Sequence, residues 1–173
     1  RIALVHPDVE LSLQHDGRAL LHFPRQDLDA RVRMILERRG VERVHGFVAE
    51  LNGVSLRAWL GDVSSAQSNG ALSVIVRRRV VVERSLTKIL YTALGPSVDA
   101  EPQTRRCGGV LMLEPGAGSV DVNVHPQKLE VRFSDPQRIY SALRQAAAQW
   151  RSERDARLAV SLLNPNATPS GHL

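Results

Sequence analysis

The stretch DVNVHPQKLEVRF, residues 121–133, predicts two alternating strand segments separated at a proline. Pro126 lacks a backbone N–H donor and therefore ends the first ladder of hydrogen bonds. Lys128 follows near the tip of a stiff connection. A lysine is a compact charge on a long stem, so Lys128 is well suited to reach a phosphate on a neighbouring domain.

The same stretch leaves a metal site open as a second interpretation. Asp121, Asn123 and His125 lie on one face of a strand, because successive side chains alternate, and could converge on a metal ion. In a third interpretation, Asn123 and His125 bond to nearby backbone and hold the turn. A metal-dependent hydrolase is less favoured because the other histidines show no ligand spacing: His6, His15, His22, His45 and His172.

Composition indicates one compact domain. The chain has 173 residues, of which 43% are hydrophobic, and this length suffices for one core. No apolar run approaches the length of a bilayer span, and the first residues lack the pattern of a signal peptide. We therefore expect a cytoplasmic protein. Cys107 is the single cysteine, and we interpret it as a structural thiol.

The charge balance favours a polyanionic partner such as nucleic acid. The net charge is +5, and only 4% of residues are aromatic. Contact with phosphates is thus expected in preference to stacking on single-stranded bases. The basic residues form three groups, namely Arg31, Arg33, Arg38 and Arg39; Arg77, Arg78 and Arg79; and Arg105 and Arg106.

Two dipeptides predict β-hairpins. Alternating apolar residues flank Asp16-Gly17 and again Asn52-Gly53, and such pairs readily adopt the positive φ of tight turns. Further strands are expected within residues 71–82, 107–115 and 119–125.

Helical periodicity predicts three helices. The first follows Asp27 as its N-cap and ends at Gly40. The others cover residues 83–95 and 136–163. Strands and helices around one core indicate an α/β or α+β two-layer sandwich with helices mostly on one sheet face. We expect one domain over residues 1–163, followed by a linker or disordered tail over 164–173.

The stretch at 121–133 closely resembles the signature of the MutL family of DNA mismatch repair proteins, roughly D-V-N-V-H-P-x-K-x-E-V-R-F, at every fixed position. The segment IALVHPDVELSLQHDGRALLHFP, residues 2–24, is similar to the opening of the family's second N-terminal domain. This resemblance implies the transducer domain of a two-domain ATPase. It also implies a fold like that of ribosomal-protein domains, with a left-handed β-α-β crossover in place of the usual right-handed one.

The resemblance assigns roles to individual residues. Lys128 matches the family lysine that contacts the terminal phosphate of ATP in the adjacent domain, where it would neutralise developing charge. Asn123, His125 and Pro126 would shape the turn that directs Lys128. ATP with Mg²⁺ is implied for the full-length protein, and no bound cofactor is expected for this chain alone.

One segment departs from the family pattern F-V-N-G-R-Y-V. The chain has IVRRRVV at residues 75–81, so Arg77 and Arg78 replace the turn-forming Asn-Gly while Arg79 matches. Because arginine tolerates positive φ poorly, we expect another turn type or a mobile hairpin. Together with Arg105 and Arg106, these three arginines could form a DNA-binding patch; alternatively, they belong to an exposed, permissive turn.

The family's nucleotide pocket lies in a preceding domain, whose motifs are missing from this sequence. We therefore expect a chain that does not hydrolyse ATP unaided. The implied partners are mismatched or nonspecific DNA, the missing N-terminal ATPase domain, a mismatch recognition protein and a second copy of the full-length protein, near the bacterial nucleoid. The alternative is a self-contained nucleic-acid-binding α/β module without an ATPase role.

Overall fold

The structure, a computed structural model, describes residues 1–63, 72–82, 84–94, 107–121 and 131–163. Its elements follow one another as α1 (Ile2–Val5), β1 (Leu11–His15), β2 (Arg18–Phe23), α2 (Leu28–Arg38), β3 (Val41–Leu51), β4 (Val54–Val63), β5 (Ser73–Val76), β6 (Arg79–Val81), α3 (Arg84–Leu94), β7 (Cys107–Pro115), β8 (Val120–Asp121), β9 (Arg132–Phe133) and α4 (Pro136–Leu163). The predicted α/β class is confirmed.

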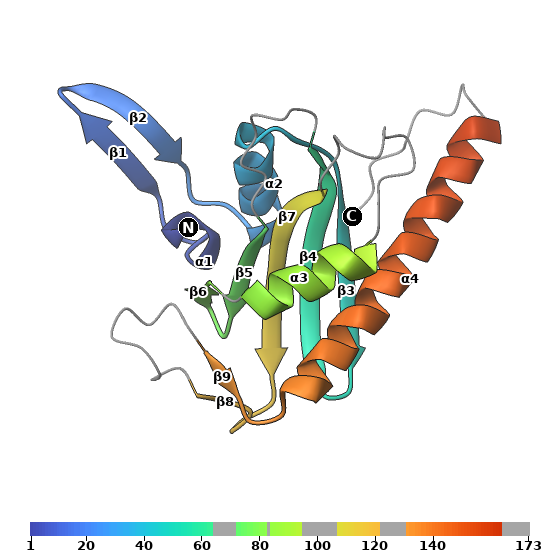
Figure 1. Cartoon of the computed structure of the whole chain (residues 1–173). Coiled ribbons are helices and arrows are strands. Elements are labelled where there is room, and N and C mark those ends of the chain that lie inside the picture. Colours follow the sequence, from blue (N-terminus) through green and yellow to red (C-terminus); the bar gives the residue numbers. More distant parts are fainter. Residues whose placement is uncertain (64–71, 83, 95–106, 122–130, 164–173) are drawn as a thin grey trace.

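A five-stranded sheet with the order β3-β4-β7-β5-β6 forms the centre of the molecule (Figure 1). β4 is antiparallel to both β3 and β7. β5 runs antiparallel to β6 and parallel to β7. A parallel pair needs a crossover connection, and α3 lies within the one that leads to β7. The left-handed sense expected for this crossover stays a prediction.

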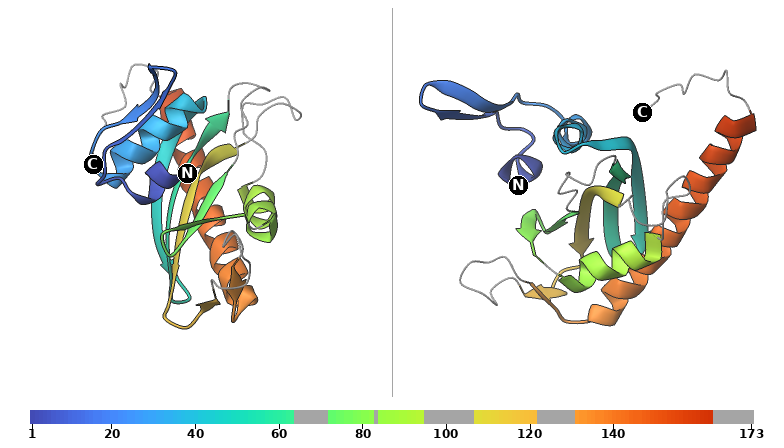
Figure 2. Two further views of the ribbon diagram at one scale, coloured as in Figure 1. Left: turned by 90° about the vertical axis from the view of Figure 1, so that its left-hand side faces the viewer. Right: turned by 45° about the horizontal axis from the view of Figure 1, so that its top comes forward.

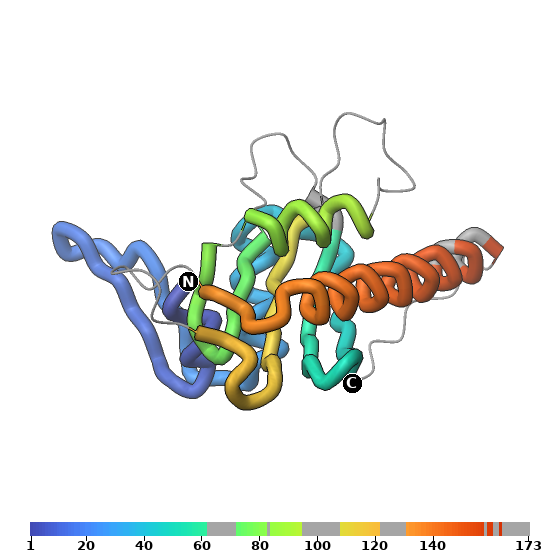
Figure 3. Tube along the Cα trace, turned by 60° about the horizontal axis from the view of Figure 1, so that its bottom comes forward, coloured from blue at the N-terminus to red at the C-terminus, as the bar shows by residue number. Residues whose placement is uncertain are grey.

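Helices cover both faces of the sheet, and each face has its own apolar core. On one face, Leu90 of α3 and Leu143 of α4 are buried together with Leu111 of β7 (Figures 1 and 3). On the other face, Leu36 of α2 packs in a second core that includes Val110 of β7. α3 and α4 thus share one face of the sheet. α1 and α2 lie on the other face and add a partial third layer to the expected two-layer sandwich.

α4 is the longest helix, with 28 residues. Ala146 and Trp150, near its middle, are both buried in the core against the sheet. Its last turns extend past the sheet, where Val160 and Leu163 are exposed (Figure 2). Within the described part of the chain, no helix is both long and apolar enough to cross a membrane.

The hairpin of β1 and β2 stands apart from the five-stranded sheet (Figures 1 and 2). We call residues 6–26, which contain it, the hairpin arm. Leu13, Leu20 and Leu21 of the arm are exposed by 51%, 56% and 40%. An isolated two-stranded hairpin is marginally stable in water, so the arm needs support from elsewhere.

The two dipeptide turns are confirmed. Asp16 and Gly17 have φ of 49° and 73°, and Asn52 and Gly53 have φ of 54° and 68°. All four residues thus have the positive φ of the turn type favoured in two-residue hairpins. The side chain of Asp27 caps α2 as expected.

The turn between β5 and β6 shows that one prediction was wrong. Arg77 and Arg78 have φ of 47° and 59°, in the left-handed region that we expected arginine to avoid. Because Val76 pairs with Arg79, these two residues form a two-residue loop, and positive φ there matches the twist of the strands. Both guanidinium groups donate to backbone carbonyls, which helps to offset a strain of about 1–2 kcal/mol per residue.

Candidate functional site

The Lys128 connection begins and ends in a short ladder at one end of the molecule. Val120 pairs with Phe133, and Asp121 pairs with Arg132, so the two ends of the connection are held side by side. A further hydrogen bond joins Ser134 N to Ser119 O at 3.0 Å. Phe133 is buried and anchors the ladder to the core shared with α4.

The residues assigned to ATP contact lie outside the described residues: Asn123, His125, Pro126 and Lys128. The same holds for Arg105 and Arg106 of the expected DNA-binding patch. Of the possible metal ligands, Asp121 alone is described. No group of three His, Cys, Asp or Glu that could hold a metal ion occurs among the residues that the structure describes. The roles assigned to these residues stay predictions.

Two arginines of the β5–β6 turn bond to the protein itself. Arg77 Nη2 donates to Gly116 O at 2.9 Å, and so joins the turn to the segment between β7 and β8. Arg78 Nη2 donates to Val5 O at 3.2 Å, which joins the turn to α1. Arg79 is exposed on β6. The structure therefore gives Arg77 and Arg78 a role in holding the turn.

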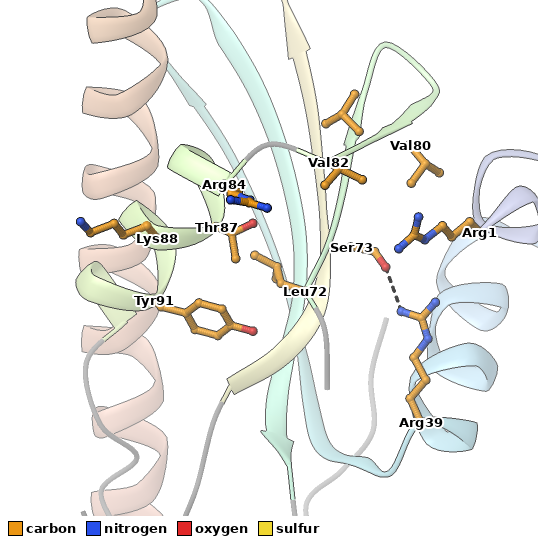
Figure 4. A pocket seen from close by; sticks show the side chains of 11 residues that line it. Arg1, Arg39, Leu72, Ser73, Val80, Val82, Arg84, Thr87, Lys88 and Tyr91 are labelled. Atoms are coloured by element: carbon orange, nitrogen blue, oxygen red, sulfur yellow. Dashed lines mark hydrogen bonds between the residues drawn. The ribbon is translucent and has the colours of Figure 1, made fainter. Parts of the chain in front are cut away.

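A basic pocket lies between α3 and the end of α2 and encloses about 540 Å³ (Figure 4). Its floor is formed by β5 and β6. Arg84, Thr87 and Tyr91 point inward from α3, whereas the ammonium group of Lys88 extends away (Figure 4). The complete lining comprises Arg1, Arg39, Leu72, Ser73, Val80, Val81, Val82, Arg84, Thr87, Lys88 and Tyr91.

Arg39 is the most enclosed cation of this pocket. Its Nη1 donates to the hydroxyl oxygen of Ser73 at 2.8 Å, and Ser73 is only 8% exposed. Burial, with the nearby positive charge of Arg1, lowers the pKa of Arg39 from its ordinary value. Both effects disfavour the charged guanidinium, and the opposite charge of a bound anion would offset them.

The described lining contains four cationic side chains and no carboxylate. Glu83, which precedes α3, lies outside the described residues. The first turn of α3 also lines the pocket, and the N-terminus of a helix favours negative charge. This arrangement suits a phosphate group better than a cationic or apolar ligand.

Sequence reasoning found Arg39 within a basic group but missed Arg84. A single arginine at the start of an amphipathic helix is not distinctive, and Arg84 lines the same pocket as Arg39 only because α3 packs on the sheet. The contiguous run Arg77, Arg78 and Arg79 predicts a basic patch, yet Arg77 and Arg78 bond to backbone carbonyls.

A second set of polar contacts lies on the α2 side of the sheet. Trp59 Nε1 donates to Asp29 Oδ1 at 2.6 Å, and Arg33 Nε donates to Asp29 Oδ2 at 2.6 Å. Burial raises the pKa of Asp29, but these hydrogen bonds and the charge of Arg33 outweigh it, so the pKa lies below its ordinary value. The set is structural, because it joins α2 to β4.

Comparison with known proteins identifies a family. Residues 32–150 match the family model described as DNA mismatch repair protein, C-terminal domain. The chain is 34% identical over 142 residues to the DNA mismatch repair protein MutL of Thermosipho melanesiensis, covering 82% of this chain and 24% of that protein. It is 30% identical to MutL of Syntrophus aciditrophicus, covering 100% of this chain and 28% of that protein. The chain thus spans about a quarter of the length of these relatives.

A solved structure shares the fold. The MutL ATPase domain of Aquifex aeolicus, complexed with ADP, superimposes with a TM-score of 0.52 at 19% identity. The match covers 84% of this chain and 42% of that one.

Proposed function

Because the chain belongs to the MutL family of DNA mismatch repair proteins, we propose that it is the transducer domain of an ATP-hydrolysing repair protein. The observation that carries this proposal is the complete signature at residues 121–133, whose ends are held together by the β8–β9 ladder. A loop with a fixed base can present one long side chain to a neighbouring domain. The likeness of the fold to a MutL ATPase domain supports the same assignment.

In this proposal Lys128 contacts the terminal phosphate of ATP bound with Mg²⁺ by the preceding domain. Water attacks the terminal phosphorus of ATP and ADP leaves, and Lys128 would stabilise the negative charge that develops on the oxygens of the transferred phosphoryl group. Asn123, His125 and Pro126 set the path of the backbone on either side of the proline. The contact also makes the position of the transducer depend on the nucleotide.

The preceding ATPase domain is the first proposed partner. The hairpin arm supports this, because Leu13, Leu20 and Leu21 are exposed on a hairpin that is not part of the five-stranded sheet. Burial of these leucines against a neighbouring domain would remove apolar surface from water. We therefore place the contact with the ATPase domain on the arm.

The second proposed partner is DNA, mismatched or nonspecific, bound through its phosphates. The basic pocket supports this role through Arg39 and Arg84, which face one hollow from opposite sides (Figure 4). In this proposal Arg79, Arg105 and Arg106 extend the contact with phosphates. Further proposed partners are a mismatch recognition protein and a second copy of the full-length chain. The proposed location of the protein is the bacterial cytoplasm, near the nucleoid.

The decisive experiment replaces Lys128 in the full-length protein. Lys128→Ala should lower kcat for ATP hydrolysis by about tenfold or more, since preorganised charge at the transferred group contributes at least that much. Arg144→Ala removes an exposed cation from α4 and is the control. An unchanged kcat in the Lys128 variant, with both proteins folded, would exclude the proposed role.

A further inference from the structure

A guanidinium group is completely buried where the hairpin arm meets the body of the domain. Arg31, on α2, is 0% exposed. Its Nη1 and Nη2 donate to five backbone carbonyls, at Ala3 (3.1 Å), His6 (3.4 Å), Pro7 (3.1 Å), Val9 (2.9 Å) and Pro24 (2.7 Å). The hydrogen bonds around Gln26 assign its amide oxygen to the side that faces Arg31, and in this orientation the oxygen accepts from Arg31 Nε at 3.2 Å.

These contacts replace the usual carboxylate partner of a buried arginine. Among the described residues no ion pair of Arg31 is present, although burying a charge without compensation is costly. Five carbonyl oxygens and one amide oxygen direct their negative ends at the group, and all of its donor nitrogens are used. The charge is therefore compensated only while all these carbonyls keep their positions.

The acceptors of Arg31 come from both sides of the β1–β2 hairpin. Pro7 and Val9 precede β1, and Pro24 follows β2, so one side chain closes the base of the hairpin. Another acceptor, Ala3, belongs to α1. Arg31 thus bonds both chain segments of the arm to a helix that packs on the sheet.

Neighbouring contacts extend this junction. The centroid of the Phe23 ring, at the end of β2, lies 5.4 Å from the guanidinium carbon of Arg31 and 4.8 Å from that of Arg38. Arg38 Nη2 also donates to His22 O at 3.3 Å. Beyond this base the hairpin projects away from the sheet (Figure 2). The direction of the arm is consequently set at its base.

We infer that Arg31 is a positioning residue that fixes the angle between the hairpin arm and the sheet. If the arm contacts the ATPase domain, as the proposed function holds, the same angle sets where that domain lies relative to Lys128. Arg31 would then affect the rate of ATP hydrolysis without touching the nucleotide.

The first test measures the arm itself. Arg31→Met keeps much of the side-chain volume and removes every donor, and amide hydrogen exchange reports the result by segment. Exchange in residues 6–26 should rise at least tenfold, with β4 and β7 unchanged. Arg33→Met on the same helix is the control, because Arg33 bonds to Asp29 and Val44 and not to the arm. Equal exchange in the arm before and after the change, or an equal rise throughout the sheet, would overturn the inference.

A conservative variant keeps the test decisive if Arg31→Met fails to fold. Arg31→Lys retains the charge but has one donor nitrogen in place of three, so it should give a smaller rise confined to the same residues. If amide exchange in residues 6–26 does not rise in Arg31→Lys, the inference that the arm needs the guanidinium group of Arg31 is overturned.

The second test uses the full-length protein. Arg31→Met should lower kcat for ATP hydrolysis several-fold with little change in KM, and Arg31→Lys should recover part of kcat. A loosened arm with unchanged kcat would overturn the link between Arg31 and the nucleotide site. If Lys128→Ala leaves kcat unchanged, the proposed function fails, and the exchange data still decide whether Arg31 positions the arm.

Discussion

Removing the two inward-facing arginines of the basic pocket should weaken DNA binding in a way that depends on salt. The double variant Arg39→Gln and Arg84→Gln retains polar side chains but removes two positive charges that line the same hollow. If each arginine contacts one phosphate of duplex DNA, the slope of log affinity against log salt should fall by about 1.8, at about 0.9 per contact. A fourfold rise in salt concentration should therefore weaken DNA binding by the parent protein about twelvefold more than DNA binding by the variant.

The assay is fluorescence anisotropy of the full-length protein with a short labelled duplex, between low and moderate salt. A matched control, Arg18→Gln with Arg144→Gln, removes the same charge from exposed positions on the hairpin arm and on α4. Thermal unfolding should be compared as well, because Arg39→Gln removes the hydrogen bond to Ser73 and should cost about 1 kcal/mol. Equal slopes for the two double variants would refute a phosphate site in the pocket, because total charge alone would then explain the binding.

Two further predictions concern stability. Asp29→Asn should lower stability at neutral pH by up to about 1 kcal/mol, because the pair with Arg33 is half exposed. A lowered carboxyl pKa adds stability that is present above the ordinary value of 3.8 and is lost as the pH falls through the lowered pKa. Acid unfolding followed by tryptophan fluorescence should therefore differ between parent and variant at neutral pH and converge below that window; a constant difference would contradict the assignment. Gly109→Ala should destabilise the domain by about 1–3 kcal/mol in urea unfolding, because its Cβ would collide with the Trp59 carbonyl oxygen. Gly116→Ala is the control, since its nearest contacts lie at 3.9 Å, and equal losses would argue against the close approach of β4 and β7.

The sequence alone was sufficient for features that depend on neighbouring residues. The Asp16-Gly17 and Asn52-Gly53 turns and the Asp27 cap form as predicted, because their conformations depend on the side chains of a few consecutive positions. The family assignment also came from one contiguous motif and is confirmed by the match over residues 32–150.

The β5–β6 turn shows where local preference was overridden. Arginine disfavours positive φ, yet Arg77 and Arg78 both adopt it. The flanking strands are paired on either side of the turn, and β5 is also held by β7, so the loop must close in two residues. The carbonyls that receive the two guanidinium groups belong to residues 5, 115 and 116, which are distant in sequence.

The tertiary structure alone decided which arginines are free to meet a partner. Composition and spacing placed Arg31 and Arg39 in one basic group and predicted contact with a polyanion for the group as a whole. In the folded chain Arg31 is buried beneath the hairpin arm, while Arg39 lines a pocket opposite Arg84. The physical reason is that a guanidinium can be satisfied by backbone carbonyls as well as by phosphates, and only packing determines which of the two lies within reach.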